Sequence, residues 1–143
     1  SGLESVTVTL SAGRTMHVVT GGPADGPPVV FIHGWGIHSY LWRYNLVACA
    51  RAGYRVIAVD LPGHGTSHIP ETPGAFALDA LSSVILDVLD ALAVRRAVLV
   101  AQSMGGRIAV DIALRAPSRV AGLVLFGSVG FGDAPRTVPL AAY

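Results

Sequence analysis

Four short runs of apolar residues constrain the fold of this chain most strongly. They span residues 29–32, 56–59, 97–101 and 122–126. A strand that is apolar throughout is buried on both faces, as in a parallel sheet, because a strand with one solvated face alternates apolar and polar residues. Only 13% of the residues are charged, against about 25% in an average soluble domain. This composition suits a sheet that is covered on both sides.

Helical patterns separate the apolar runs. We expect helices over residues 39–52, 75–93 and 104–115. In the longest, 75–93, apolar residues recur three or four positions apart and form an amphipathic stripe. The first begins at Ser39, a residue type that caps helices, and Pro117 closes the third. Strands and helices therefore alternate, which implies right-handed crossovers between parallel strands.

A β-hairpin precedes the first apolar run. Residues 6–10 and 15–20 alternate apolar and polar side chains on either side of a turn. The predicted fold class is therefore α/β: an N-terminal β-hairpin followed by a mostly parallel, doubly wound sheet with helices on both faces. We predict a single domain over residues 1–143, with the Gly- and Pro-rich stretch 129–143 as the start of a linker or cap region.

Ser103 is the candidate nucleophile. It lies in A-Q-S-M-G at residues 101–105, a variant of G-x-S-x-G placed between a predicted strand and a predicted helix. The turn of a nucleophile elbow is so tight that small residues must flank the serine, and Ala101, Gly105 and Gly106 meet this need. The serine would project from a helix N-terminus, where N–H groups favour a developing negative charge. The alternative is an ordinary serine in a turn.

A second motif, H-G-W-G at residues 33–36, directly follows the first apolar run. In hydrolases with a nucleophile elbow, one backbone N–H from this loop and the N–H after the nucleophile bind the oxyanion of the tetrahedral intermediate. Here the donors would be the N–H groups of Trp35 and Met104. The alternative is a plain strand-to-helix turn that buries its tryptophan.

A third motif, D-L-P-G-H-G-T-S at residues 60–67, follows the strand at 56–59. It predicts a tight structural turn, because Pro and Gly restrict its shape and Asp60 and Ser67 can hydrogen-bond its backbone. His64 lies in this turn and is a possible base. We interpret it as a residue that serves the loop.

Together the three motifs resemble the α/β-hydrolase superfamily, over about residues 29–128. The resemblance implies that Ser103 is the nucleophile, that Trp35 and Met104 form the oxyanion hole, and that no cofactor is needed. Tryptophan after His-Gly is similar to certain esterases, perhydrolases and non-haem haloperoxidases. Serine rather than aspartate at position 103 argues against the dehalogenase and epoxide-hydrolase branches. Ala101 in place of Gly and Gln102 in place of His or Asn depart from the usual pattern.

The acid and base of a catalytic triad have no evident place in this chain. The family's order is Ser, then an acid, then His, yet all five histidines precede Ser103. Of the two later acids, Asp111 falls within a predicted helix, and Asp133 follows the last apolar run, where a few family members place their acid. We favour a piece of a longer or cleaved protein over a truncated form that pairs with a partner, and over a non-catalytic relative.

Charge and composition exclude other classes of function. The net charge is +1, and the ten basic residues are arginines scattered along the chain, so no basic stripe supports nucleic-acid binding. No apolar run approaches the roughly 18–20 residues of a membrane span, and no Cys/His cluster has metal-ligand spacing. We expect a cytoplasmic protein without metal or cofactor.

The functional hypothesis is a carboxylesterase- or lipase-like hydrolase that cleaves a small-molecule ester, or a related acyl bond, through an acyl-enzyme. Two alternatives remain open. One is a non-catalytic module that associates through the open edge of the strand at 122–126, with itself or with a missing C-terminal portion. The other keeps the enzyme but changes the reaction to perhydrolysis or to C–C bond hydrolysis.

Overall fold

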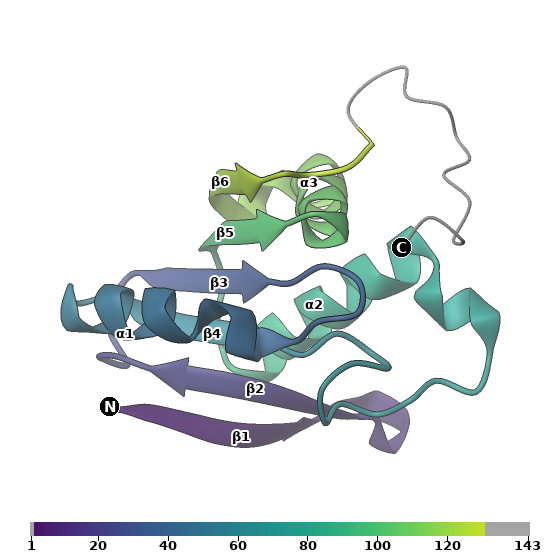
Figure 1. The fold of residues 1–143 in the computed structure, drawn as a ribbon, viewed down its shortest axis with the longest axis horizontal. Helices are drawn as coiled ribbons and strands as arrows, with labels where there is room; N and C mark the ends of the chain where they lie inside the picture. Colours follow the sequence, from purple (N-terminus) through teal and green to yellow (C-terminus); the bar gives the residue numbers. More distant parts are fainter. Residues whose placement is uncertain (1, 131–143) are drawn as a thin grey trace.

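The computed structural model describes residues 2–130, which form a six-stranded sheet with the strand order β1-β2-β4-β3-β5-β6 (Figure 1). The strands are β1 Leu3–Thr9, β2 Thr15–Gly21, β3 Pro28–Ile32, β4 Arg55–Val59, β5 Ala97–Gln102 and β6 Val120–Phe126. The α-helices are α1 Arg43–Arg51, α2 Leu78–Ala91 and α3 Met104–Arg115, and the short 3-10 helices are η1 Ser11–Gly13, η2 Ser39–Trp42, η3 Pro73–Phe76 and η4 Pro117–Arg119. Most of the predicted linker at 129–143, with Asp133, lies outside the described residues.

The sheet has the predicted topology. β1 pairs antiparallel with β2 from Leu3–Gly21 to Thr9–Thr15, and β2 pairs antiparallel with β4. β3 then runs parallel to both β4 and β5, and β5 runs parallel to β6. An N-terminal hairpin followed by a parallel, doubly wound sheet is therefore confirmed.

Two separate cores lie on the two faces of this sheet. Side chains on successive strand residues point to opposite faces, and β3 divides accordingly: Val30 and Ile32 face α2 and α3, whereas Val29 and Phe31 face α1. The larger core contains Ile85 from α2, and the smaller one contains Leu46 from α1 and Trp42 just before it. In Figure 1 α1 lies in front of the sheet. Helices on both faces are thus confirmed, and the apolar runs at 29–32, 56–59 and 97–101 lie within the covered strands β3, β4 and β5.

Two helix boundaries differ from the prediction. Residues 39–42 form η2 rather than the first turn of α1, so Ser39 is the first residue of η2 and not the cap of α1, which begins after Trp42. The backbone N–H of Ser39 donates to Asp60 Oδ1 (2.7 Å). The second helix spans 78–91 instead of 75–93. It is preceded by the 3-10 turn η3, and the extended backbone of Ala77 (φ −63°, ψ 150°) separates η3 from α2.

The last strand is only half-covered. Strand β6 forms one edge of the sheet, and among residues 2–130 it pairs with β5 alone. Its four consecutive apolar side chains at 123–126 are 38–49% exposed. Strand β6 is therefore apolar on both faces, like a buried strand, but within residues 2–130 its side chains are not covered as those of a buried strand are.

Candidate active site

Ser103 lies at the junction between β5 and α3. Strand β5 ends at Gln102, α3 begins at Met104, and Ser103 joins them with φ 53° and ψ −121°. A positive φ is unfavourable for any residue with a Cβ and costs on the order of 1–3 kcal/mol, so it persists only where surrounding structure enforces it. The sharp strand–turn–helix at a serine is the geometry of a nucleophile elbow.

Two glycines allow the elbow to form. A Cβ on Gly105 would overlap the backbone carbonyl oxygens of Ile32 and His33, and one on Gly106 would overlap the side chain of Ser128. The first turn of α3 therefore packs directly against the end of β3. Gly105 and Gly106 are therefore the small residues that the sequence predicted after the nucleophile, because a side chain at either position would overlap its neighbours.

The loop after β3 lies against the elbow. A Cβ on Gly34 would lie only 3.0 Å from the Cβ of Ser103, so a glycine is needed for the loop to approach this closely. Strands β3 and β5 are parallel neighbours, and their carboxyl ends deliver the loop at 33–36 and the elbow to the same edge of the sheet. The side chain of Trp35 is exposed rather than buried, which excludes the interpretation of this loop as a turn that buries a tryptophan.

His33 is buried and holds two loops together. Its Nδ1–H donates to the Gly34 carbonyl (2.7 Å), and its Nε2 accepts the backbone N–H of Leu61 (2.9 Å). Burial lowers the pKa of His33 more than the hydrogen bond to Gly34 raises it, so the ring is neutral. A neutral ring bonded on both nitrogens to backbone is a structural element and has no nitrogen left for Ser103.

Asp60 organises the loop after β4. Its carboxylate is buried and accepts hydrogen bonds from Ser39 N–H (2.7 Å), His17 Nδ1 (2.8 Å) and Thr66 N–H (3.3 Å). Burial by itself would raise the pKa of Asp60, but these hydrogen bonds outweigh it and hold that pKa below the ordinary value. Ser67 adds a hydrogen bond from its Oγ to the Asp60 carbonyl (2.6 Å). The predicted structural role of Asp60 and Ser67 is confirmed.

His64 belongs to the loop, as predicted, and has a partner that the sequence pattern did not suggest. Its Nε2 accepts the backbone N–H of Gly36 (3.1 Å), and its Nδ1 lies 3.0 Å from the Pro62 carbonyl. The Trp35 ring packs edge-on against the His64 ring, with centroids 5.2 Å apart. Nothing in the local sequence pairs position 64 with position 36, because the contact forms only when the two loops meet.

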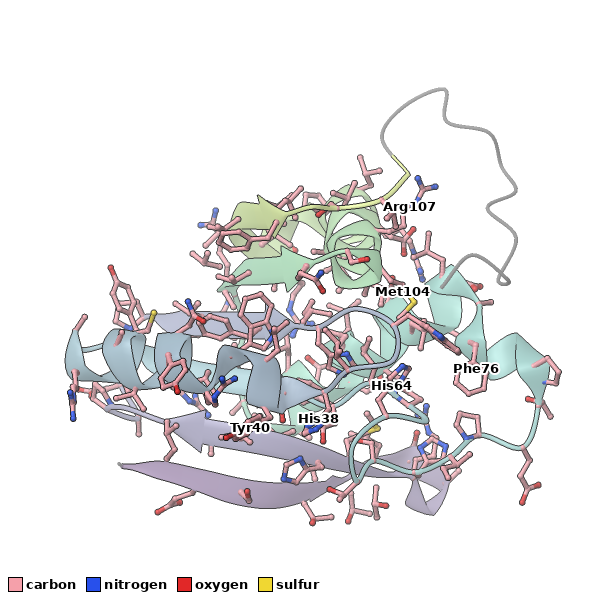
Figure 2. All side chains as sticks on the ribbon, viewed as in Figure 1. His38, Tyr40, His64, Phe76, Met104 and Arg107 are labelled. Atoms are coloured by element: carbon pink, nitrogen blue, oxygen red, sulfur yellow. The ribbon has the colours of Figure 1, made fainter. Side chains whose placement is uncertain are left out.

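Two hollows open beside the elbow. One, of about 380 Å³, lies between the loops after β3 and β4 and is lined by Trp35, Ile37, His38, His64, Ile69 and Phe76; Figure 2 shows His38, His64 and Phe76, with Met104 at the start of α3 nearby. The other, of about 280 Å³, lies between α1 and β6 and is lined by Leu41, Trp42, Asn45, Gln102 and Phe126. Both have mainly apolar walls, which suits an organic substrate better than a highly charged one.

The described residues contain no complete triad. Within 2–130 no side chain hydrogen-bonds to the Ser103 hydroxyl, and His17, His33 and His64 are bonded elsewhere. Asp111 pairs with Arg115 along α3 at 3.0 Å, in agreement with a structural role. Asp133 lies outside the described residues, so its candidacy as the acid stays a prediction.

A metal site and a membrane-spanning helix are both absent from the part of the chain that the structure describes. Across residues 2–130 we found no cluster of three or more His, Cys, Asp or Glu side chains suited to a metal ion. None of the helices described there has both the length and the apolar character needed to span a membrane.

The model of the α/β-hydrolase fold family matches residues 27–140. The chain belongs to this family. It is 43% identical over 122 residues to the dihydrolipoyllysine-residue acetyltransferase component of the acetoin cleaving system of Pseudomonas putida, covering 85% of this chain and 32% of that protein. It is 39% identical over 124 residues to a non-heme chloroperoxidase of Streptomyces lividans, covering 86% of this chain and 44% of that protein.

Solved structures agree with the family. An epoxide hydrolase from Vigna radiata matches with a TM-score of 0.81 at 32% identity, over 87% of this chain and 38% of that chain. A thioesterase domain from the curacin biosynthetic pathway matches with a TM-score of 0.82 at 28% identity, over 90% of this chain and 47% of that chain. The α/β-hydrolase prediction is confirmed, and the chain spans about a third to a half of the length of these relatives.

Proposed function

We propose that this chain carries the nucleophile of a serine-dependent, carboxylesterase-like hydrolase that cleaves an ester or a related acyl bond. The observation that carries the proposal is the backbone of Ser103, whose positive φ at the junction of β5 and α3 stores strain at one hydroxyl-bearing residue. A serine in an ordinary turn has no need of such a conformation.

The reaction follows from this geometry in two steps. Ser103 Oγ bonds to the acyl carbon while its proton passes to a general base, and the carbonyl electron pair moves onto oxygen. The N–H groups of Trp35 and Met104 stabilise that oxyanion, each donor contributing roughly 2.7–4 kcal/mol. The alcohol leaves with the proton, and water then attacks the acyl-enzyme, releases the acid and restores Ser103. In this proposal residues outside this chain supply the base and the acid that orients it.

Two of the relatives support a reaction on an acyl group. Two of them are named as an acetyltransferase component and a thioesterase domain, and both names describe reactions of acyl groups. Epoxide hydrolases are also similar to this chain, but serine at position 103 favours an acyl-enzyme over the aspartyl ester implied for that branch. The chloroperoxidase keeps perhydrolysis open as a variant of the same acyl-enzyme.

A series of p-nitrophenyl esters of increasing acyl length tests this proposal. In the full-length protein, which includes the residues that supply the base, we expect turnover by the wild type and a loss of about a thousandfold or more in kcat for Ser103→Ala, because the residual catalysis of a hydrolase without its nucleophile comes from binding and the oxyanion hole. Ser83→Ala, a serine on the surface of α2, is the matched control and should retain full activity. Turnover of no ester, or equal activity of the Ser103→Ala variant, would show that the proposal is wrong.

A second candidate function rests on β6. Its four exposed apolar side chains, and an edge that has no partner strand besides β5 among residues 2–130, are an arrangement that pairs readily with another strand. Under this alternative the chain is a module that associates through β6 with a strand of a second copy or of a missing C-terminal portion. Sedimentation of the purified chain at increasing concentration separates the cases: dimers that Val124→Lys abolishes support self-association, and a strict monomer contradicts it.

A further inference from the structure

Two hydrogen bonds clamp the peptide units on either side of Trp35. The Gly34 carbonyl and the Trp35 N–H belong to one planar, trans peptide unit, so a bond to one fixes the direction of the other. His33 Nδ1–H donates to that carbonyl at 2.7 Å. The following peptide unit contains the Gly36 N–H, which donates to His64 Nε2 at 3.1 Å.

The hydrogen bonds of His64 define its tautomer. A carbonyl oxygen can only accept, so the 3.0 Å contact between Nδ1 and the Pro62 carbonyl places the ring proton on Nδ1 and leaves Nε2 as an acceptor. This is the tautomer that the Gly36 N–H requires. Both bonds of the ring are therefore satisfied at once, and the imidazole is held in one orientation by the backbone of its own loop.

The segment that His64 holds has few other restraints. Gly36 adopts a φ of +75° with no atom within 4 Å of the position of a Cβ, and the Trp35 side chain is 64% exposed. Packing therefore does not fix this part of the loop. The hydrogen bond to Gly36 and the edge-on contact of the His64 ring with Trp35 at 5.2 Å both come from one residue on the neighbouring loop.

We propose that His64 is a positioning residue for the oxyanion hole: by accepting the N–H of Gly36 it fixes the peptide unit that follows Trp35, so that Trp35 and its N–H are held from both sides. The inference rests on the proposed function, because it presumes that the Trp35 N–H serves an oxyanion. His64 touches neither Ser103 nor the reacting atoms. It fixes the peptide unit after Trp35, as His33 fixes the one before it.

Two variants separate this role from simple packing. His64→Phe keeps a ring against Trp35 and removes the acceptor, whereas His64→Gln can return an acceptor oxygen toward Gly36. We expect His64→Phe to lower kcat on p-nitrophenyl esters about tenfold, as for the loss of one hydrogen bond, with KM changed less than about twofold since the bound ground state is barely affected. His64→Gln should recover most of the loss. His68→Phe, the same substitution at a loop histidine whose buried Nδ1 has no hydrogen-bond partner among the described residues, is the control.

A direct measurement of the bond accompanies the kinetics. In the purified wild-type protein, NMR should detect scalar coupling between the Gly36 amide nitrogen and His64 Nε2 across the N–H···N bond. Absence of that coupling, or equal kcat for His64→Phe and wild type, would overturn the inference. If the wild type hydrolyses no ester while the coupling is present, the proposed function fails and with it the role in catalysis, but the clamp itself is established.

Discussion

At the scale of single residues, the site depends on side chains whose roles come from backbone contacts. Ser103 is strained, His33 and His64 bind peptide groups, and Asp60 gathers three donors. None of these side chains acts on its own loop alone. His33, His64 and Asp60 each bond to the backbone of a neighbouring loop and so fix its position at the carboxyl edge of the sheet.

The strain at Ser103 predicts that replacing this residue by glycine raises the stability of the protein while it removes the nucleophile and so the activity. Ser103→Gly should raise the free energy of unfolding by about 1 kcal/mol, because glycine adopts a positive φ without the steric cost. Ser103→Ala keeps the Cβ and should gain none of this. Urea unfolding of both variants gives the comparison, and equal stability of the two would mean that the backbone at position 103 is relaxed.

The lowered pKa of Asp60 predicts a specific loss of stability in acid. A carboxyl whose pKa is lower in the folded than in the unfolded state contributes stability above the unfolded value, and loses it as the pH falls through the folded value. Asp60→Asn should therefore cost about 2 kcal/mol at neutral pH, where hydrogen bonds to a charged acceptor are lost, and progressively less below the ordinary pKa of 3.8.

Urea unfolding of the wild type and Asp60→Asn between neutral pH and the lowest pH at which the protein folds tests this. The difference in unfolding free energy should shrink toward the acid end. If the difference in unfolding free energy stays constant over the whole pH range, Asp60 stabilises the protein through the packing of its side chain and not through its negative charge.

At the scale of elements, apolar patterning predicted the strands well, and capping residues predicted the helix starts poorly. The strands at 29–32 and 56–59 follow directly from runs that only a doubly covered sheet can bury. Ser39 was a wrong prediction because a 3-10 turn, η2, separates it from the start of α1. The contact between His64 and Gly36 was not predictable, because both partners lie in loops whose separation in space is set by the order of β3 and β4.

The junction between α3 and β3 predicts a sharp difference between two glycines. Gly105→Ala should destabilise the protein by about 2 kcal/mol, because its Cβ would overlap the carbonyls at the end of β3 and force the helix outward. Gly74→Ala places a methyl group in open space and should change stability by less than about 0.5 kcal/mol. Thermal unfolding of the Gly105→Ala and Gly74→Ala variants tests this prediction. Similar melting temperatures for the two variants would contradict the close packing of α3 on β3.

At the scale of the whole molecule, the parallel strands bring the chemistry to one end. The loops after β3 and β4 and the elbow after β5 all leave the carboxyl edge of the sheet, where open α/β sheets bind their ligands. A larger hollow near Arg95, Arg96 and Arg119 lies by the starts of β3, β5 and β6, at the opposite end. The nucleophile was predictable because its motif is local, whereas its base was not, since no histidine follows Ser103 in this chain.

Trapping of the acyl-enzyme tests the central claim most directly. The wild-type protein is mixed with a p-nitrophenyl ester and quenched in acid within the first turnover, and the mass of the protein and of its peptides is then measured. The proposal predicts that the protein gains the mass of one acyl group on the peptide that contains Ser103, and that Ser103→Ala gains none. Hydrolysis of the ester with the acyl group on another residue, or with no acylated protein at any time, would contradict it.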